Sequence, residues 1–131
     1  MAIECPVCGS DQVTLSDHTR SISVPYGPSV KYVARIGTCG VCETSGDFLR
    51  VNDARIEEAL LESVRREVLG ILDYLSGLGM TNAHVERVLG LPTRTIARWK
   101  RGEFSESAVV LLRILRTYPW IMRVVDDGFD A

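Results

Sequence analysis

Two short segments decide how this chain folds: CPVCG at residues 5–9 and CGVC at residues 39–42. Together they hold all four cysteines of a 131-residue chain. A two-residue gap lets both thiolates of a pair face one metal ion, and zinc prefers four sulfur ligands in a closed tetrahedron. The sequence therefore predicts a structural Zn²⁺ site with the ligands Cys5, Cys8, Cys39 and Cys42.

Other interpretations of the cysteines remain open. A gap of 30 residues separates the two pairs, which exceeds the roughly 15–20 residues of the usual zinc pattern; a β-hairpin would close it. The same ligands can hold an iron–sulfur cluster, or the pairs can be unconnected reduced thiols. A redox motif is disfavoured, because neither pair follows a strand and opens a helix.

No enzyme is expected. His84-Val85-Glu86 matches the His-x-Glu of zinc deaminases, but here the cysteines come first and all four are needed by one zinc. We find no Ser/His/Asp set, no glycine-rich phosphate loop and no outstanding pair of carboxylates.

The first 50 residues favour a small antiparallel β domain. Three β-rich segments (11–16, 21–24 and 30–36) are separated by the turn residues Pro25, Gly27 and Pro28. A domain of this size usually needs disulfide bonds or a bound metal ion in addition to its apolar core. We therefore expect the zinc to fold this domain rather than to act in catalysis.

Residues 51–131 are expected to be all α, which makes the chain α+β. A helix over 53–79, capped by Asp53, carries an apolar seam that packs against the following helices or, in its N-terminal half, pairs with a second copy. Ser105 can cap a later helix and Pro119 begins a last short one. The seam consists of Leu61, Val64, Val68, Ile71, Leu75 and Leu78.

The segment TNAHVERVLGLPTRTIARWKRG at residues 81–102 fits a helix-turn-helix. Thr81 caps a helix to Leu89, Gly90 breaks it, and Pro92 opens a second helix that stops at Gly102. The apolar positions that would join the two helices are Val85, Val88, Leu91, Ile96 and Trp99.

The polar side of the second helix is a candidate DNA-binding surface. Arg94 and Arg98 are four residues apart, so they share one face, and arginine reads guanine edges in the major groove. Lys100 and Arg101 suit phosphate contacts. The plainer interpretation is a solvated basic helix face. The predicted DNA-binding residues are Thr93, Arg94, Thr95, Arg98, Lys100 and Arg101.

The charge distribution agrees with this surface. The chain has a net charge of −2, but residues 81–131 carry 8 basic and 6 acidic side chains, and 87–101 has no acid. No apolar run is long enough for a membrane helix. The start, Met-Ala-Ile-Glu, has no basic or apolar character of a secretion signal, so a cytoplasmic location is expected.

The combination resembles the MqsA/YgiT-type antitoxins. The Cys-Pro-Val-Cys start, the second Cys-x-x-Cys-Glu and the 30-residue spacing resemble the family's zinc domain, and residues 81–119 resemble its DNA-binding domain. The resemblance implies a zinc domain that binds a toxin and a dimeric C-terminal domain that represses its own operon. The resemblance implies that two residues of the second helix read bases, and these positions fall on Arg94 and Arg98. The family usually has an asparagine at the first position, so Arg94 departs from its pattern.

The sequence therefore predicts a two-domain repressor, with a zinc β domain at 1–50 and a helical DNA-binding domain at 51–131. It is expected to act as a homodimer on a palindromic operator in double-stranded DNA and as the antitoxin of a type II toxin–antitoxin pair. The alternatives are a stand-alone transcriptional regulator and an adaptor that binds protein.

Overall fold

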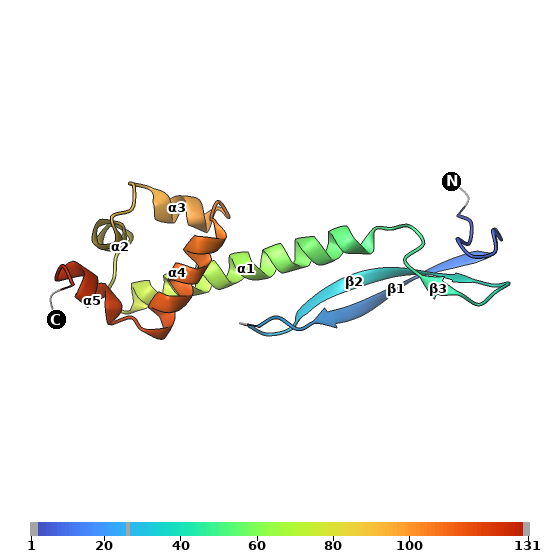
Figure 1. Cartoon of the computed structure of the whole chain (residues 1–131), viewed down its shortest axis with the longest axis horizontal. Coiled ribbons are helices and arrows are strands. Elements are labelled where there is room, and N and C mark those ends of the chain that lie inside the picture. The colour runs from blue at the N-terminus through green and yellow to red at the C-terminus, as the bar shows by residue number, and fades with distance from the viewer. Residues whose placement is uncertain (1–2, 26, 130–131) are drawn as a thin grey trace. The chain divides into compact units, whose positions relative to one another are not determined.

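The computed structural model describes residues 3–25 and 27–129 (Figure 1). The chain is α+β, as predicted: a three-stranded antiparallel sheet comes first and helices follow. It forms two compact units that divide between Ser63 and Val64. The predicted domain boundary at 50/51 lies at the start of the longest helix, whereas the units divide within that helix.

The N-terminal unit (residues 1–63) is built on a β-hairpin. Strand β1 (Val13–Ile22) pairs along its whole length with β2 (Val30–Cys39), in a register that sets Val13 opposite Cys39 and Ile22 opposite Val30. The short β3 (Ser45–Gly46) pairs with the end of β2. The sequence predicted two separate β segments where the structure has the single strand β1. The polar residues at the centre of β1 are exposed, and the pairing with β2 continues through them.

Helix α1 (Asn52–Gly77) begins beside this sheet. Asp47 accepts hydrogen bonds from the backbone N–H groups of Val51 and Asn52, so Asp47, rather than the predicted Asp53, serves the N-terminus of the helix. The buried Asn52 side chain accepts from the Arg35 N–H and donates to the Arg35 C=O. It thus pairs with β2 as a neighbouring strand would.

The C-terminal unit (residues 64–131) gathers four short helices around the C-terminal part of α1 (Figure 1). They are α2 (Asn82–Leu89), α3 (Thr95–Lys100), α4 (Glu106–Thr117) and α5 (Ile121–Asp126). One buried cluster contains residues of all five helices, with Ile71, Ile96 and Leu112 among its fully buried side chains. A unit with a shared core of this kind can hold its surface helices in fixed positions.

The predicted seam of α1 is buried at its centre. Val68, Ile71 and Leu75 are at most 1% exposed and belong to the shared cluster, as the first interpretation expected. Leu61 and Leu78 at the two ends are 57% and 48% exposed. The seam therefore packs over about two turns, and pairing with a second copy stays a prediction.

Both ends of α2 and the start of α4 follow their local signals. Thr81 and Ser105 are N-caps, as predicted. Their side chains accept hydrogen bonds from the N–H groups of His84 and Ala108, respectively. Gly90 ends α2 with a left-handed φ of 66°. Its N–H and that of Leu91 bond back to the last turn in the pattern of a Schellman motif.

Helix α3 starts three residues later than predicted. Pro92 does not open the helix but begins a turn, in which the Thr95 N–H and hydroxyl both donate to the Pro92 carbonyl, the hydroxyl at 2.6 Å. Arg94, at the N-cap position, has a left-handed φ of 68°. Because this conformation is not helical, regular α3 can begin only at Thr95.

Candidate metal centre and candidate nucleic-acid surface

The four cysteine sulfurs lie in one cluster. Cys5 Sγ is 3.5 Å from Cys42 Sγ, Cys8 Sγ is 3.5 Å from Cys39 Sγ, and all four sulfurs lie within 4.8 Å of one another. Zinc–sulfur bonds of about 2.3 Å place tetrahedral sulfurs roughly 3.8 Å apart. The cluster could hold a metal ion, and its spacing and all-sulfur chemistry fit Zn²⁺.

The two cysteine pairs are built alike. The first sulfur of each pair accepts a hydrogen bond from the N–H two residues later, at 3.4 Å in both cases. The first carbonyl of each pair accepts from the N–H four residues later, which belongs to Gly9 in one pair and Glu43 in the other. Both residues have a left-handed φ, whereas Gly40 does not.

Backbone contacts bring the two pairs together. The Gly40 N–H, next to Cys39, donates to the carbonyl of Gln12, which follows the first pair, at 2.8 Å. Within the second cysteine turn, the Cys39 N–H donates to the Thr44 carbonyl at 2.9 Å. Cys5 and Cys39 are buried, and Cys8 and Cys42 lie at the surface. The β1–β2 pairing thus closes the 30-residue gap, and four sulfurs leave no coordination position for a substrate.

The thiols of the cluster differ in acidity. Contacts with the Thr44 hydroxyl and backbone lower the pKa of Cys42 to about 6. A hydrogen bond with the Ser10 backbone lowers the pKa of Cys8, but the Cys39 thiol, burial and the other cysteines raise it by more, to about 12. The N–H groups of Cys42 and Val41 lower the pKa of Cys39. A metal ion must therefore displace the proton of Cys8.

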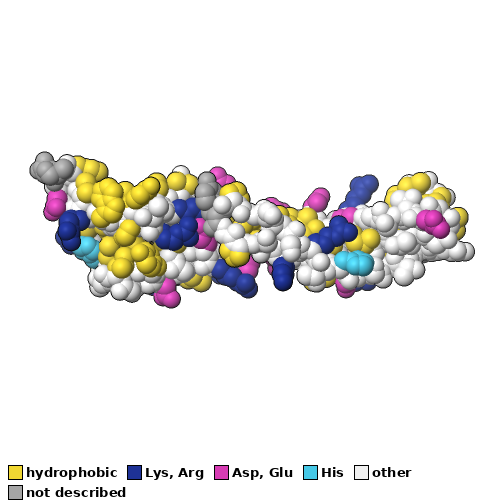
Figure 2. All heavy atoms as spheres, turned by 90° about the horizontal axis from the view of Figure 1, so that it is seen from below, with side chains coloured by type: hydrophobic (Ala, Val, Ile, Leu, Met, Phe, Trp, Pro, Cys, Tyr) yellow, Lys and Arg dark blue, Asp and Glu magenta, His cyan; other side chains and the backbone are white. Residues whose placement is uncertain are grey.

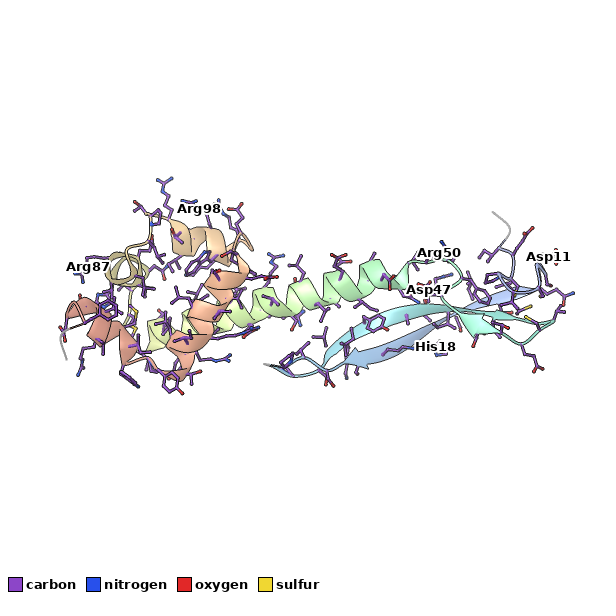
Figure 3. All side chains as sticks on the ribbon, in the orientation of Figure 1. Asp11, His18, Asp47, Arg50, Arg87 and Arg98 are labelled. Carbon is purple, nitrogen blue, oxygen red and sulfur yellow. The ribbon has the colours of Figure 1, made fainter. Side chains whose placement is uncertain are left out.

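The predicted DNA-binding residues all lie on α3 or next to it. Thr93, Arg94 and Arg98 are exposed, and so are Lys100 and Arg101 at the helix end. Figure 3 shows Arg98 on the outer side of α3. Thr95 is half-buried, and its hydroxyl is bonded within the turn. Because Arg94 precedes the regular helix, it lies at the N-terminal end of α3, with Arg98 one turn along.

The inner side of α3 is apolar. Ile96 is fully buried and Trp99 is 7% exposed, and both belong to the shared cluster. Val85 from α2 lies in the same cluster, with Val88 and Leu91 packed against it. Trp99 is therefore a core residue, as predicted, and is not available to stack on bases.

A second surface of the helical unit holds none of the predicted site residues. A cleft of about 380 Å³ is lined by α2, α5 and their neighbouring loops. At its rim, Arg87 forms a hydrogen bond of 3.0 Å with His84 and an ion pair of 3.9 Å with Asp126, so that α2 and α5 are joined. Figure 2 shows hydrophobic side chains gathered over the helical unit, at the left of the view. The lining residues are Met80, His84, Pro119, Trp120, Met122, Arg123 and Asp126.

Comparisons with known proteins give no relative. No family model matches the chain, and no curated protein and no solved structure shows significant similarity to it. Within residues 3–25 and 27–129, no helix has the length and apolar character needed to cross a membrane.

Proposed function

We propose that this protein is a sequence-specific DNA-binding repressor that uses α2 and α3 as a helix-turn-helix. The observation that carries the proposal is the two-sided character of α3. Ile96 and Trp99 anchor one side in the core, while Arg94, Arg98 and Lys100 lie exposed on or beside the same short helix. A recognition helix needs a fixed inner side and basic outer residues that reach bases and phosphates.

Each basic residue has a distinct role in this proposal. Arg94 and Arg98 read base edges, because bidentate contact with guanine is the commonest specific contact of arginine. Lys100 and Arg101 hold the phosphate backbone. Arg101 also lies 3.5 Å from Glu103, so part of its charge is balanced within the chain.

The proposed active form is a homodimer on a palindromic operator. One helical unit reads one half-site, and two-fold symmetry matches two half-sites a helical turn apart. The four-cysteine unit carries a structural Zn²⁺ and supplies the surface for a protein partner. In the antitoxin form of this proposal, which rests on the resemblance given by the cysteine and helix motifs, that partner is a toxin.

The decisive experiment selects binding sites from random duplex DNA with the full-length zinc-loaded protein. Affinity for the selected site is then measured by fluorescence anisotropy. Arg94→Ala and Arg98→Ala should each lose about 1–3 kcal/mol of specific binding and relax the preference at one base position. Arg123→Ala on α5, an equally charged exposed residue, is the matched control and should bind like the wild type.

Two outcomes would contradict the proposal. Unchanged affinity in both Arg94→Ala and Arg98→Ala would remove the recognition role of α3. Binding to DNA that is weak and insensitive to salt would favour the protein adaptor, because DNA affinity falls steeply with salt. Co-purification with the product of the neighbouring reading frame would separate an antitoxin from a stand-alone regulator.

A further inference from the structure

A basic residue of α1 lies against the C-terminal end of α3. A Cβ placed on Gly102 would be 2.8 Å from Arg65 Nε, 3.3 Å from its Cδ and 3.4 Å from its Cζ. The Arg65 side chain therefore runs directly over the residue that ends α3. Sequence patterns do not reveal this, because Arg65 and Gly102 are 37 residues apart.

Gly102 serves this contact in two ways. Its φ of 92° lies in the left-handed region, which glycine adopts without strain. Its N–H donates to the Trp99 carbonyl and the next N–H to the Arg98 carbonyl, which closes α3. The missing side chain then leaves the space in which the Arg65 guanidinium lies.

Arg65 adds to a local excess of positive charge. Lys100 and Arg101 are exposed at the same end of α3, and the charge of Arg101 is partly balanced by Glu103. Arg65 takes part in further interactions within the chain. A guanidinium has five N–H donors, so contacts within the chain are compatible with contacts to a phosphate.

We propose that Arg65 binds the phosphate backbone of the same DNA that α3 reads. This inference rests on the proposed function and extends its surface to α1, which lies outside the helix-turn-helix segment. Arg65 contributes affinity and orientation but no base preference, because phosphate contacts carry no sequence information. The alternative is a purely structural role, in which Arg65 only caps the end of α3.

The test uses the full-length zinc-loaded protein and the variants Arg65→Gln and Arg65→Lys. Glutamine keeps part of the aliphatic stem over Gly102 but removes the charge, and lysine keeps the charge. Arg66→Gln, the next residue on the same helix, is the matched control. Anisotropy is measured between 50 and 200 mM salt with the selected operator and with a scrambled duplex, and each variant's thermal midpoint is recorded.

Arg65→Gln should weaken binding to the operator and to the scrambled duplex by the same factor. It should also reduce the slope of log affinity against log salt concentration by about 0.9, the value for one phosphate contact on duplex DNA. Arg65→Lys should restore the slope, and Arg66→Gln should leave it unchanged. A lowered thermal midpoint with an unchanged slope would overturn the inference in favour of the structural role. Absence of salt-dependent binding in the wild type would instead overturn the proposed function.

Discussion

Removing the metal should unfold the N-terminal unit and leave the helices of the C-terminal unit folded. Apart from cysteines, the buried apolar side chains described in residues 3–63 are Val30, Ala34 and Ile36. A buried valine or isoleucine contributes about 1.5–3 kcal/mol. A structural zinc in small peptides contributes about 10–16 kcal/mol at pH 7. The metal is therefore expected to outweigh the apolar core of this unit.

The C-terminal unit has no such dependence. Its buried cluster joins residues from five helices, and no cysteine belongs to it. In the cysteine unit, by contrast, the sulfurs connect the start of the chain to the end of β2, so the ends of the hairpin separate when the metal leaves. Removal of the metal should therefore disorder β1 and β2 of the N-terminal unit before it affects the helices of the C-terminal unit.

The assay is amide NMR and circular dichroism of the full chain during titration with a strong chelator. Amide signals of β1 and β2 should collapse to the narrow range of an unfolded chain, while helical ellipticity is largely retained. The same chelator already saturated with zinc is the matched control, and added Zn²⁺ should restore the signals. Cobalt in place of zinc should give the intense thiolate charge-transfer absorption of a four-sulfur site.

Three results would refute this reasoning. If the β1–β2 signals survive complete removal of the metal, the sheet does not depend on it and the cysteine cluster is not a folding site. If helical ellipticity disappears in the same transition, the two units do not fold independently. One metal per chain is also required, and half a metal per chain would place the ligands between two copies.

Two further perturbations test other parts of the structure. Because the pKa of Cys8 is raised to about 12 and that of Cys42 is lowered to about 6, metal binding at pH 7 should release the Cys8 proton. Affinity should fall as pH falls, more steeply below pH 6 where Cys42 is also protonated, and calorimetry in buffers of different ionisation enthalpy would count the protons. Separately, Glu67 accepts from Arg113 Nε at 2.7 Å and from Nη2 at 2.9 Å, with the two side chains only 16% and 25% exposed. Glu67→Gln should cost about 1.5–3 kcal/mol of unfolding free energy, measured by urea denaturation against the exposed Asp73→Asn, and equal stability of the two variants would contradict a structural role for the ion pair.

Much of the helical unit could be predicted from the sequence because its signals are local. Thr81 and Ser105 bond to N–H groups three residues away, and Gly90 ends α2 where it stands in the sequence. The burial of Ile96 and Trp99 follows from their spacing on a short helix. Such signals need no knowledge of distant residues.

Features that depend on distant partners were missed. Asn52 is buried because it pairs with the Arg35 backbone 17 residues away, and nothing in its neighbourhood marks it. Strand β3 is two residues long and lacks an apolar pattern, so its pairing with β2 has no signature. The Arg65–Gly102 contact likewise joins two elements by tertiary packing.

The cluster of four cysteines was predictable as a set, but the arrangement of its sulfurs was not. Spacing alone groups Cys5 with Cys8 and Cys39 with Cys42. In the fold, two sulfur–sulfur contacts of 3.5 Å run between the pairs, from Cys5 to Cys42 and from Cys8 to Cys39. Only the hairpin register, which sets Val13 opposite Cys39, could have shown how the pairs meet.

Left-handed backbone conformation by itself does not mark a functional residue in this chain. Arg94 has a φ of 68° and Glu43 a φ of 62°, and each such non-glycine residue costs about 1–2 kcal/mol. Glu43 is explained by its place in the second cysteine turn, where Gly9 holds the equivalent position in the first. Arg94 has no such explanation: its side chain makes no capping hydrogen bond and lies exposed at the start of α3. A glycine would satisfy that turn without strain, and the proposed contact of Arg94 with DNA would account for an arginine at this position.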